Sequence, residues 1–377
     1  MSAVPDGCTE AIMKHFNLEH RFELMQSIPY FKGLPLHLDS VVFGENQVEI
    51  NGTTHKFGVY RKYREGIQVP KDHEDENRRG GSSKDLAPNG VMVRNTMLLP
   101  GDVELTPKMN WVEGYDGKDA TASPDFQLLL QYTVKKGNEE KIQRFSYTKK
   151  LHEAFKYLTT KLFGGYFFSI QVKNLTLKWG LSVIPLPVGV SFTPENLILG
   201  SSSFLKSFPL RNMLNKNRKI HVLDVEFGLG NASFHYDFTL FEKCHTALLR
   251  DLLGEVERPV EKILKLKNPN IIVVDPARSF ISPFVKIIQN RMQNCPPEHH
   301  KFTLVCPNEQ FTNVTLDKLE AEFKHRVTID SPMILEINNQ EHLQLEVALT
   351  IGEGWRQQSQ LTIEVKRKSR KRPISFD

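Results

Sequence analysis

Apolar and polar residues alternate along the chain from Leu34 to Tyr63. This period of two is typical of strands that bury one face against a core. Asn51-Gly52 divides the stretch, and this dipeptide favours a tight turn between antiparallel strands. The pattern therefore predicts a strand-rich unit whose last strand reaches Tyr63.

The segments that follow have different patterns. Residues 68–95 are polar and contain several Gly, Ser and Pro residues, which predicts an exposed loop. Strands are predicted at 97–99 and at 126–134. The second of these is expected to pair with 142–147 through a turn at 136–138.

Residues 149–163 predict an amphipathic helix, because apolar side chains recur there at steps of four, three and four. These side chains are Leu151, Phe155, Leu158 and Leu162. The two glycines at 164–165 are expected to end the helix. We assign its apolar stripe to the core.

Strand-like segments recur along the second half of the chain. Their centres are Leu175, Leu197, Val222, Ile272, Leu304 and Thr328. The intervals are 22, 25, 50, 32 and 24 residues, and leucine-rich repeats have periods of about 20 to 29 residues. Helices are predicted at 241–264 and 279–292, and an antiparallel hairpin or terminal cap at 333–365.

The start of the chain carries two short helical patterns with an apolar face. The residues of that face are Ile12, Met13, Phe16, Phe22, Met25 and Ile28. Helices of about ten residues are not stable alone in water, so this face must pack on something. It either closes the core of the following domain or docks on another protein.

These patterns predict an α/β chain with a short N-terminal helical motif, a β-rich middle unit and an irregular, leucine-rich-repeat-like C-terminal part. The predicted divisions are 1–33 for the helical motif, 34–169 for the β-rich unit with its loop 68–95 and helix 149–163, 170–365 for the repeat-like region and 366–377 for a basic tail.

Composition narrows the class of protein. The chain of 377 residues is 40% hydrophobic and 25% charged, which is typical of a globular protein. No uncharged apolar run is long enough for a membrane-spanning helix, and the first residues do not resemble a secretory leader. The cysteines are too widely spaced for a zinc knuckle, so we expect reduced thiols in the cytoplasm or nucleus.

The net charge of +5 is concentrated at the end of the chain. The last dozen residues contain one acid, Asp377, and six bases: Lys366, Arg367, Lys368, Arg370, Lys371 and Arg372. Such a cluster is a candidate nuclear-import signal, a nonspecific contact for polyanions, or a solvated terminus. The rest of the chain is balanced in charge.

No residue pattern points to a specific chemistry. Asp224 and Glu226 share one face of a predicted strand, as an acid/base or metal-binding pair would, but solvent-facing charges explain them equally well. Tyr60, Arg61 and Tyr63 could stack on bases, yet the balanced body offers no basic groove for a nucleic-acid backbone. We therefore expect no enzyme, no cofactor and no metal, and nucleic acid is disfavoured as a partner.

Several motifs, in the same order, resemble the nematode F-box C family. A degenerate F-box is indicated by Pro5, Ile12, Met13, Phe16, Arg21 and Phe22. The companion domain of uncharacterised function in that family is indicated by residues 35–40, 50–54, 58–63, 99–103, 149–154, 172–175 and 208–210.

The resemblance implies a non-enzymatic substrate receptor of a Skp1-cullin-F-box ubiquitin ligase. The six apolar residues between Ile12 and Ile28 would then bind a Skp1-like adaptor, and the rest of the chain would capture an unknown protein substrate. The alternative is an adaptor-independent protein-binding module, which would be nuclear if the basic tail acts as an import signal. An enzyme whose site is assembled from distant residues is a third hypothesis.

Overall fold

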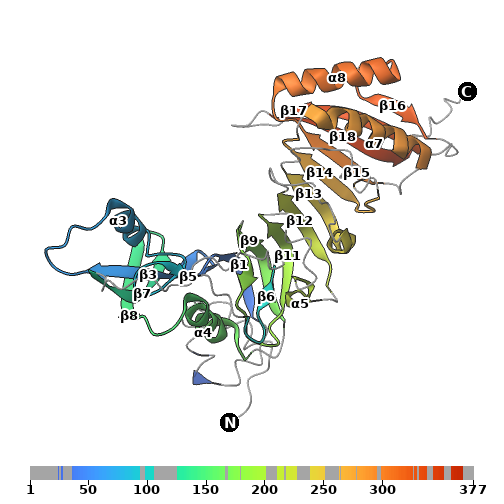
Figure 1. The fold of residues 1–377 in the computed structure, drawn as a ribbon. Helices are drawn as coiled ribbons and strands as arrows, with labels where there is room; N and C mark the ends of the chain where they lie inside the picture. The colour runs from blue at the N-terminus through green and yellow to red at the C-terminus, as the bar shows by residue number, and fades with distance from the viewer. Residues whose placement is uncertain are drawn as a thin grey trace, which may run out of the picture. The chain divides into compact units, whose positions relative to one another are not determined.

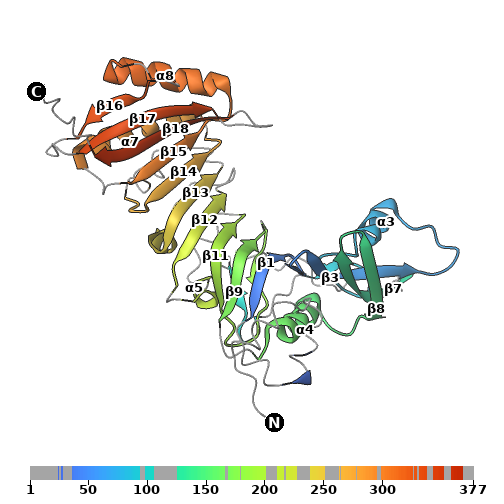
Figure 2. The same cartoon turned by 180° about the vertical axis from the view of Figure 1, so that it is seen from behind.

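The computed structural model describes residues 24, 27–28, 36–93, 98–105, 125–165, 169–178, 180–200, 210–215, 218–226, 238–250, 263, 265–276, 278–294, 299–325, 327–328, 331–337, 343–351 and 358–367. The chain divides into two compact units. Unit 1 comprises residues 1–198 and 203–218, and unit 2 comprises 199–202 and 219–377. The described residues are mixed α/β, dominated by β-sheet with few helices, as Figures 1 and 2 show.

Unit 1 is built on a sheet with the strand order β11-β9-β1-β2-β3-β7-β8. The strands are β1 (His37–Gly44), β2 (Gln47–Ile50), β3 (Thr53–Tyr63), β7 (Phe126–Lys136), β8 (Glu139–Ser146), β9 (Ile170–Leu177) and β11 (Phe192–Leu199). β1 is parallel to β9, and the pairs from β1 to β8 are antiparallel. Two short pairs, β10 (Val183–Ile184) with β6 (Val103–Glu104) and β4 (Asp85–Leu86) with β5 (Met92–Val93), complete the unit.

The predicted hairpin at Asn51-Gly52 is confirmed. Asn51 and Gly52 both have positive φ, of 47° and 80°, which suits the tight turn between β2 and β3. The Asn51 side chain also accepts hydrogen bonds from the backbone amides of Asp39 and Ser40, at 2.9 and 3.0 Å. The turn therefore fixes the register of three strands.

The amphipathic helix is confirmed as α4 (Leu151–Phe163), which buries Leu151, Phe155 and Phe163 against the sheet. The Phe163 ring lies 6.1 Å from that of Phe43 and 5.5 Å from that of Phe192, centroid to centroid. Aromatic pairs at such distances add to the free energy of burial. A core of strand and helix side chains thus holds α4 in place.

A buried ion pair joins α4 to the loop at 98–105. Lys156 Nζ lies 2.6 Å from Asp102 Oδ1, and the Asp102 side chain is only 2% exposed. Lys156 also donates to the carbonyl of Leu186. Leu99 does not lie in a strand, contrary to the prediction for 97–99, because its amide donates to Asp102 Oδ2 in a turn.

The interval 68–95 is not simply a loop. It contains the helix α3 (Lys71–Arg78) and the short strands β4 and β5. Residue periodicity could not reveal α3, because this helix buries none of its side chains. Polar contacts with β3 hold it instead.

Unit 2 is a sheet of order β16-β17-β18-β15-β14-β13-β12. Its parallel strands are β12 (Ile220–Glu226), β13 (Cys244–Arg250), β14 (Asn270–Val274) and β15 (Lys301–Val305). The antiparallel strands are β16 (Met333–Glu336), β17 (Leu343–Ile351) and β18 (Ser359–Arg367), which confirm a hairpin within 333–365. The helical segments given by the described residues of unit 2 are η3 (Phe238–Lys243), η4 (Arg278–Phe280), α7 (Ile281–Asn294) and α8 (Glu309–Phe323), while α5 (Leu210–Met213) belongs to unit 1.

Two predictions in this region are wrong. The helix expected at 241–264 is replaced at its start by the end of η3 and by β13, because Ala247 and Leu249 alternate into the core opposite Leu223 and Val225. β13 lies within the 50-residue interval between Val222 and Ile272, in which the sequence predicted no strand. Thr328 lies outside any strand.

Candidate functional site

A groove of about 860 Å³ opens over β3, β7 and β8 in unit 1 and is lined also by α3. Eight of its lining residues are basic, and only Glu74 and Glu140 are acidic. The first four bases are Lys56, Arg61, Lys62 and Arg64. The other four are Arg78, Arg79, Lys135 and Arg144. We call this feature the cationic groove.

Strand register explains how the floor of the groove forms. Lys56 lies opposite Thr133, which lies opposite Ile142 on β8. One row further, Gly58, Gln131 and Arg144 are aligned in the same way. Alternate residues of neighbouring strands share a face, so these rows form one surface.

Arg144 is held in place on this floor. Its Nε donates to Gln131 Oε1 at 2.9 Å, and Gln131 is only 2% exposed. Its guanidinium carbon lies 3.8 Å from the centroid of the Tyr60 ring, a cation–π contact. Within the described residues the terminal nitrogens of Arg144 have no hydrogen-bond partner, so they are available to a carboxylate or phosphate.

One wall of the groove is built by α3 and the glycines that follow it. Val59 and Ser82 exchange two backbone hydrogen bonds, of 2.9 and 2.8 Å. The Asn77 side chain accepts from the Arg61 amide at 3.0 Å and donates to the Arg61 carbonyl at 2.8 Å. Gly58 permits this close approach, because a Cβ there would lie 2.2 Å from the Gly80 carbonyl oxygen.

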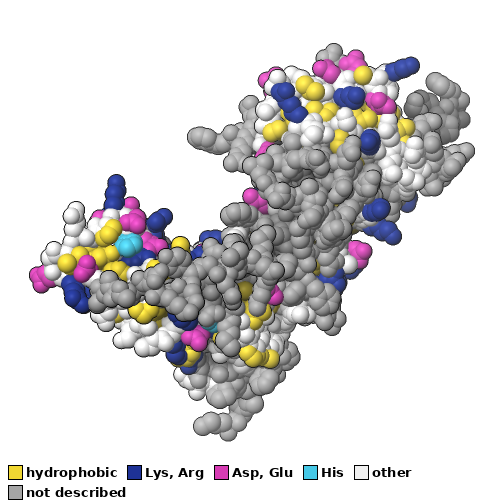
Figure 3. All heavy atoms as spheres, in the orientation of Figure 1, with side chains coloured by type: hydrophobic (Ala, Val, Ile, Leu, Met, Phe, Trp, Pro, Cys, Tyr) yellow, Lys and Arg dark blue, Asp and Glu magenta, His cyan; other side chains and the backbone are white. Residues whose placement is uncertain are grey.

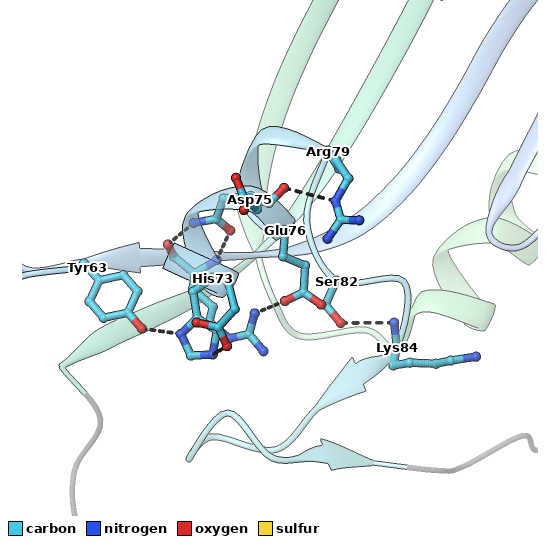
Figure 4. Close-up of polar contacts among 10 residues, drawn as sticks. Tyr63, His73, Asp75, Glu76, Arg79, Ser82 and Lys84 are labelled. Atoms are coloured by element: carbon cyan, nitrogen blue, oxygen red, sulfur yellow. Dashed lines mark hydrogen bonds and ion pairs between the residues drawn. The ribbon is translucent and has the colours of Figure 1, made fainter. Parts of the chain in front are cut away.

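Side chains reinforce the same wall, as Figure 4 shows. Arg61 is 5% exposed and its guanidinium pairs with Glu76. His73 Nδ1 and the Tyr63 hydroxyl are 2.5 Å apart. Burial raises the pKa of Tyr63 above its ordinary value.

Positive charge in the groove is only partly compensated. Lys56 Nζ donates to the Arg79 carbonyl at 2.7 Å, and burial together with the charge of Arg79 lowers the pKa of Lys56. In the part of the chain that the structure describes, Lys62, Arg64 and Lys135 form no ion pair. A bound anion would relieve this crowding of like charges. Figure 3 shows basic and acidic side chains side by side over α3.

Sequence reasoning missed this groove. Alternation along β3 does place Lys56, Tyr60 and Lys62 on one face, and that was the available signal. The sequence did not predict the wall, because α3 has no apolar stripe. It did not predict the full set of basic residues either, because those on β7 and β8 come from distant parts of the sequence.

The aromatic residues proposed for base stacking are engaged internally. The Tyr60 ring is covered by Arg144, and the Tyr63 ring lies 5.2 Å from Phe126, centroid to centroid. Asp224, considered as half of a catalytic pair, binds Arg250 Nε and Nη2 at 2.8 and 3.0 Å. This cross-strand ion pair accounts for that carboxylate.

The predicted adaptor face lies almost wholly outside the described residues. Only Ile28 is described: its amide donates to the Leu24 carbonyl at 2.8 Å, and its side chain is 42% exposed. The other five, Ile12, Met13, Phe16, Phe22 and Met25, are not described.

The basic tail is described only at its start. Lys366 and Arg367 end β18, and Lys366 Nζ lies 2.6 Å from Glu346 Oε1. Lys368, Arg370, Lys371 and Arg372 lie outside the described residues.

No helix among the described residues is long and apolar enough to cross a membrane. No group of three or more His, Cys, Asp or Glu side chains in the same residues is arranged to hold a metal ion.

The fold places the chain among mixed α/β proteins dominated by β-sheet. Residues 150–308 match a family model described as a domain of unknown function, DUF3557. The match runs from the residue before α4 to Asn308, so the cationic groove lies outside it. No curated protein and no solved structure matches the chain.

Proposed function

We propose that this chain is a non-enzymatic protein-interaction subunit whose recognition surface includes the cationic groove. The observation that carries the proposal is the held guanidinium of Arg144, set in a wide groove with eight basic and two acidic lining residues. A pre-organised arginine loses little conformational freedom on binding, so it favours recognition of an anionic group.

The resemblance to F-box C proteins supports a more specific role as substrate receptor of a Skp1-cullin-F-box ubiquitin ligase. In this role the apolar face that includes Phe16 and Ile28 docks on a Skp1-like adaptor. The parallel run from β12 to β15 then serves as an irregular, leucine-rich-repeat-like scaffold, consistent with short parallel strands at 220–226, 244–250, 270–274 and 301–305.

Co-purification of the full chain with a Skp1-like protein tests the receptor role. We expect Phe16→Asp to abolish co-purification while the circular dichroism spectrum stays unchanged. Val188→Asp is the matched control, because it introduces the same charge at a side chain that is 73% exposed. Adaptor binding that survives Phe16→Asp would refute this role, and unfolding of that variant would show that the face belongs to the core.

The alternative proposal is an adaptor-independent protein-binding module, in the cytoplasm or nucleus. The cluster Lys368, Arg370, Lys371 and Arg372 favours the nuclear version. Replacing these four residues by Gln should move a fluorescent fusion out of the nucleus. An unchanged distribution would remove the tail as an import signal.

A further inference from the structure

Within the described residues, β8 is the edge strand of the unit 1 sheet. It is the last strand in the order, and no strand among the described residues pairs with its outer side. All eight of its residues are exposed, including Ile142 at 46% and Phe145 at 49%. Such an edge presents unpaired backbone N–H and C=O groups, which natural proteins commonly cover or use for strand addition.

The free edge adjoins the cationic groove. Ile142 and Arg144 line the groove from β8 itself, and Lys135 lines it from β7. Because side chains alternate across a strand, a segment added to β8 would direct every second side chain over the groove. The other side chains would lie beside Phe145 on the opposite face.

We propose that the β8 edge and the cationic groove together bind an extended acidic peptide segment of a partner protein by strand addition. This inference rests on the proposed protein-interaction function and names the class of segment recognised. The backbone of the segment pairs with β8. Its carboxylates reach the terminal nitrogens of Arg144 and the Nζ of Lys135 on the groove face, and its apolar side chains contact Phe145 on the opposite face.

Geometry favours a peptide over a single-stranded nucleic acid. The rings of Tyr60 and Tyr63, the two aromatic residues that line the groove, already pack against Arg144 and Phe126. An extended peptide instead uses the free backbone of the edge, which nucleic acid does not.

Fluorescence anisotropy with the full chain tests the proposal. The probe is a labelled peptide of about ten residues in which Glu alternates with Val, long enough to cover the eight residues of β8. We expect saturable binding that weakens as salt rises. A peptide with Gln in place of Glu, and one N-methylated at alternate residues, should both bind at least about tenfold more weakly.

Three variants connect binding to the groove. Arg144→Gln should weaken binding about tenfold, because a charge-assisted contact is lost. Lys141→Gln is the matched control, since Lys141 lies on β8 but on the opposite face, and it should change affinity less than about twofold. Glu140→Gln should strengthen binding about twofold, a gain that misfolding cannot produce.

Equal binding of the Glu and Gln peptides, or of the wild type and Arg144→Gln, would overturn the proposal. Tighter binding of a single-stranded oligothymidylate than of the peptide would overturn it in favour of nucleic acid. The assay contains no adaptor protein. A failed peptide experiment therefore leaves co-purification with a Skp1-like protein as a separate test of the receptor role.

Discussion

Replacing Gly58 by Ala should loosen the wall of the cationic groove. The added Cβ would lie 2.2 Å from the Gly80 carbonyl oxygen and 3.2 Å from the Gly81 carbonyl carbon. Both neighbours are backbone atoms, so no side-chain rotation relieves the contact. Gly80 and Gly81 have φ of 100° and 91°, which leaves the crossing segment little room to adjust without losing its conformation.

The magnitude follows from two ways of relieving the clash. Shifting the packed segment costs about 1–3 kcal/mol, as overpacking does elsewhere. Releasing the segment breaks the two Val59–Ser82 bonds and the two Asn77–Arg61 bonds, at about 0.5–1.5 kcal/mol each. The smaller cost prevails, so we expect a local destabilisation of about 2 kcal/mol.

Hydrogen exchange at the Val59 and Ser82 amides measures this effect directly. A loss of about 2 kcal/mol corresponds to an exchange rate about thirtyfold faster. Gly52→Ala is the control, because nothing lies within 4 Å of its Cβ position and any cost there comes from its φ of 80°. Unchanged protection of both amides in Gly58→Ala would refute the steric argument.

Three further changes test the core of the structure. Lys156→Met should lower the free energy of unfolding of unit 1 by about 3–5 kcal/mol, because the Asp102 carboxylate is left buried without its ion-pair partner. In a thermal melt, adding Asp102→Asn should restore part of this loss. The Tyr147 hydroxyl donates to Asp85 Oδ1 at 2.5 Å, and burial together with this contact raises the pKa of Tyr147 above its usual 10. The contribution of Tyr147 to stability is therefore complete below pH 10 and is lost as pH rises further. In urea melts, a Tyr147→Phe chain that loses stability above pH 10 as steeply as the wild type would contradict this. Burial raises the pKa of Cys244 to about 12 and that of Cys306 to about 11. At pH 8, iodoacetamide should therefore modify both thiols only after urea is added, as detected by mass spectrometry. Modification of these thiols in the folded chain would contradict their burial.

Local patterns in the sequence were sufficient for elements that carry a clear turn signal or a clear helical spacing of apolar residues. The hairpin at Asn51-Gly52 and the helix α4 follow from turn chemistry and apolar spacing, and both appear as predicted. β13 was missed because its alternating pattern covers only a short stretch, next to a segment whose apolar spacing is typical of a helix. Ala247 and Leu249 can be recognised as core residues of a strand only when their register with β12 is known.

The candidate site was harder to predict, for physical reasons. Its wall is a polar helix held by backbone contacts with β3, and such contacts leave no periodic signal in the sequence. Its floor depends on the register between β3, β7 and β8, which brings Lys56, Lys135 and Arg144 together from distant positions. Charge totals gave no hint, because the body of the chain is balanced.

Hydrogen exchange of the β8 amides, with and without the alternating Glu-Val peptide, tests the recognition surface most directly. Strand addition predicts that amides within residues 139–146 exchange more slowly when the peptide is bound, while those of β12 in unit 2 stay unchanged. Peptide binding without any added protection in β8 would contradict the account.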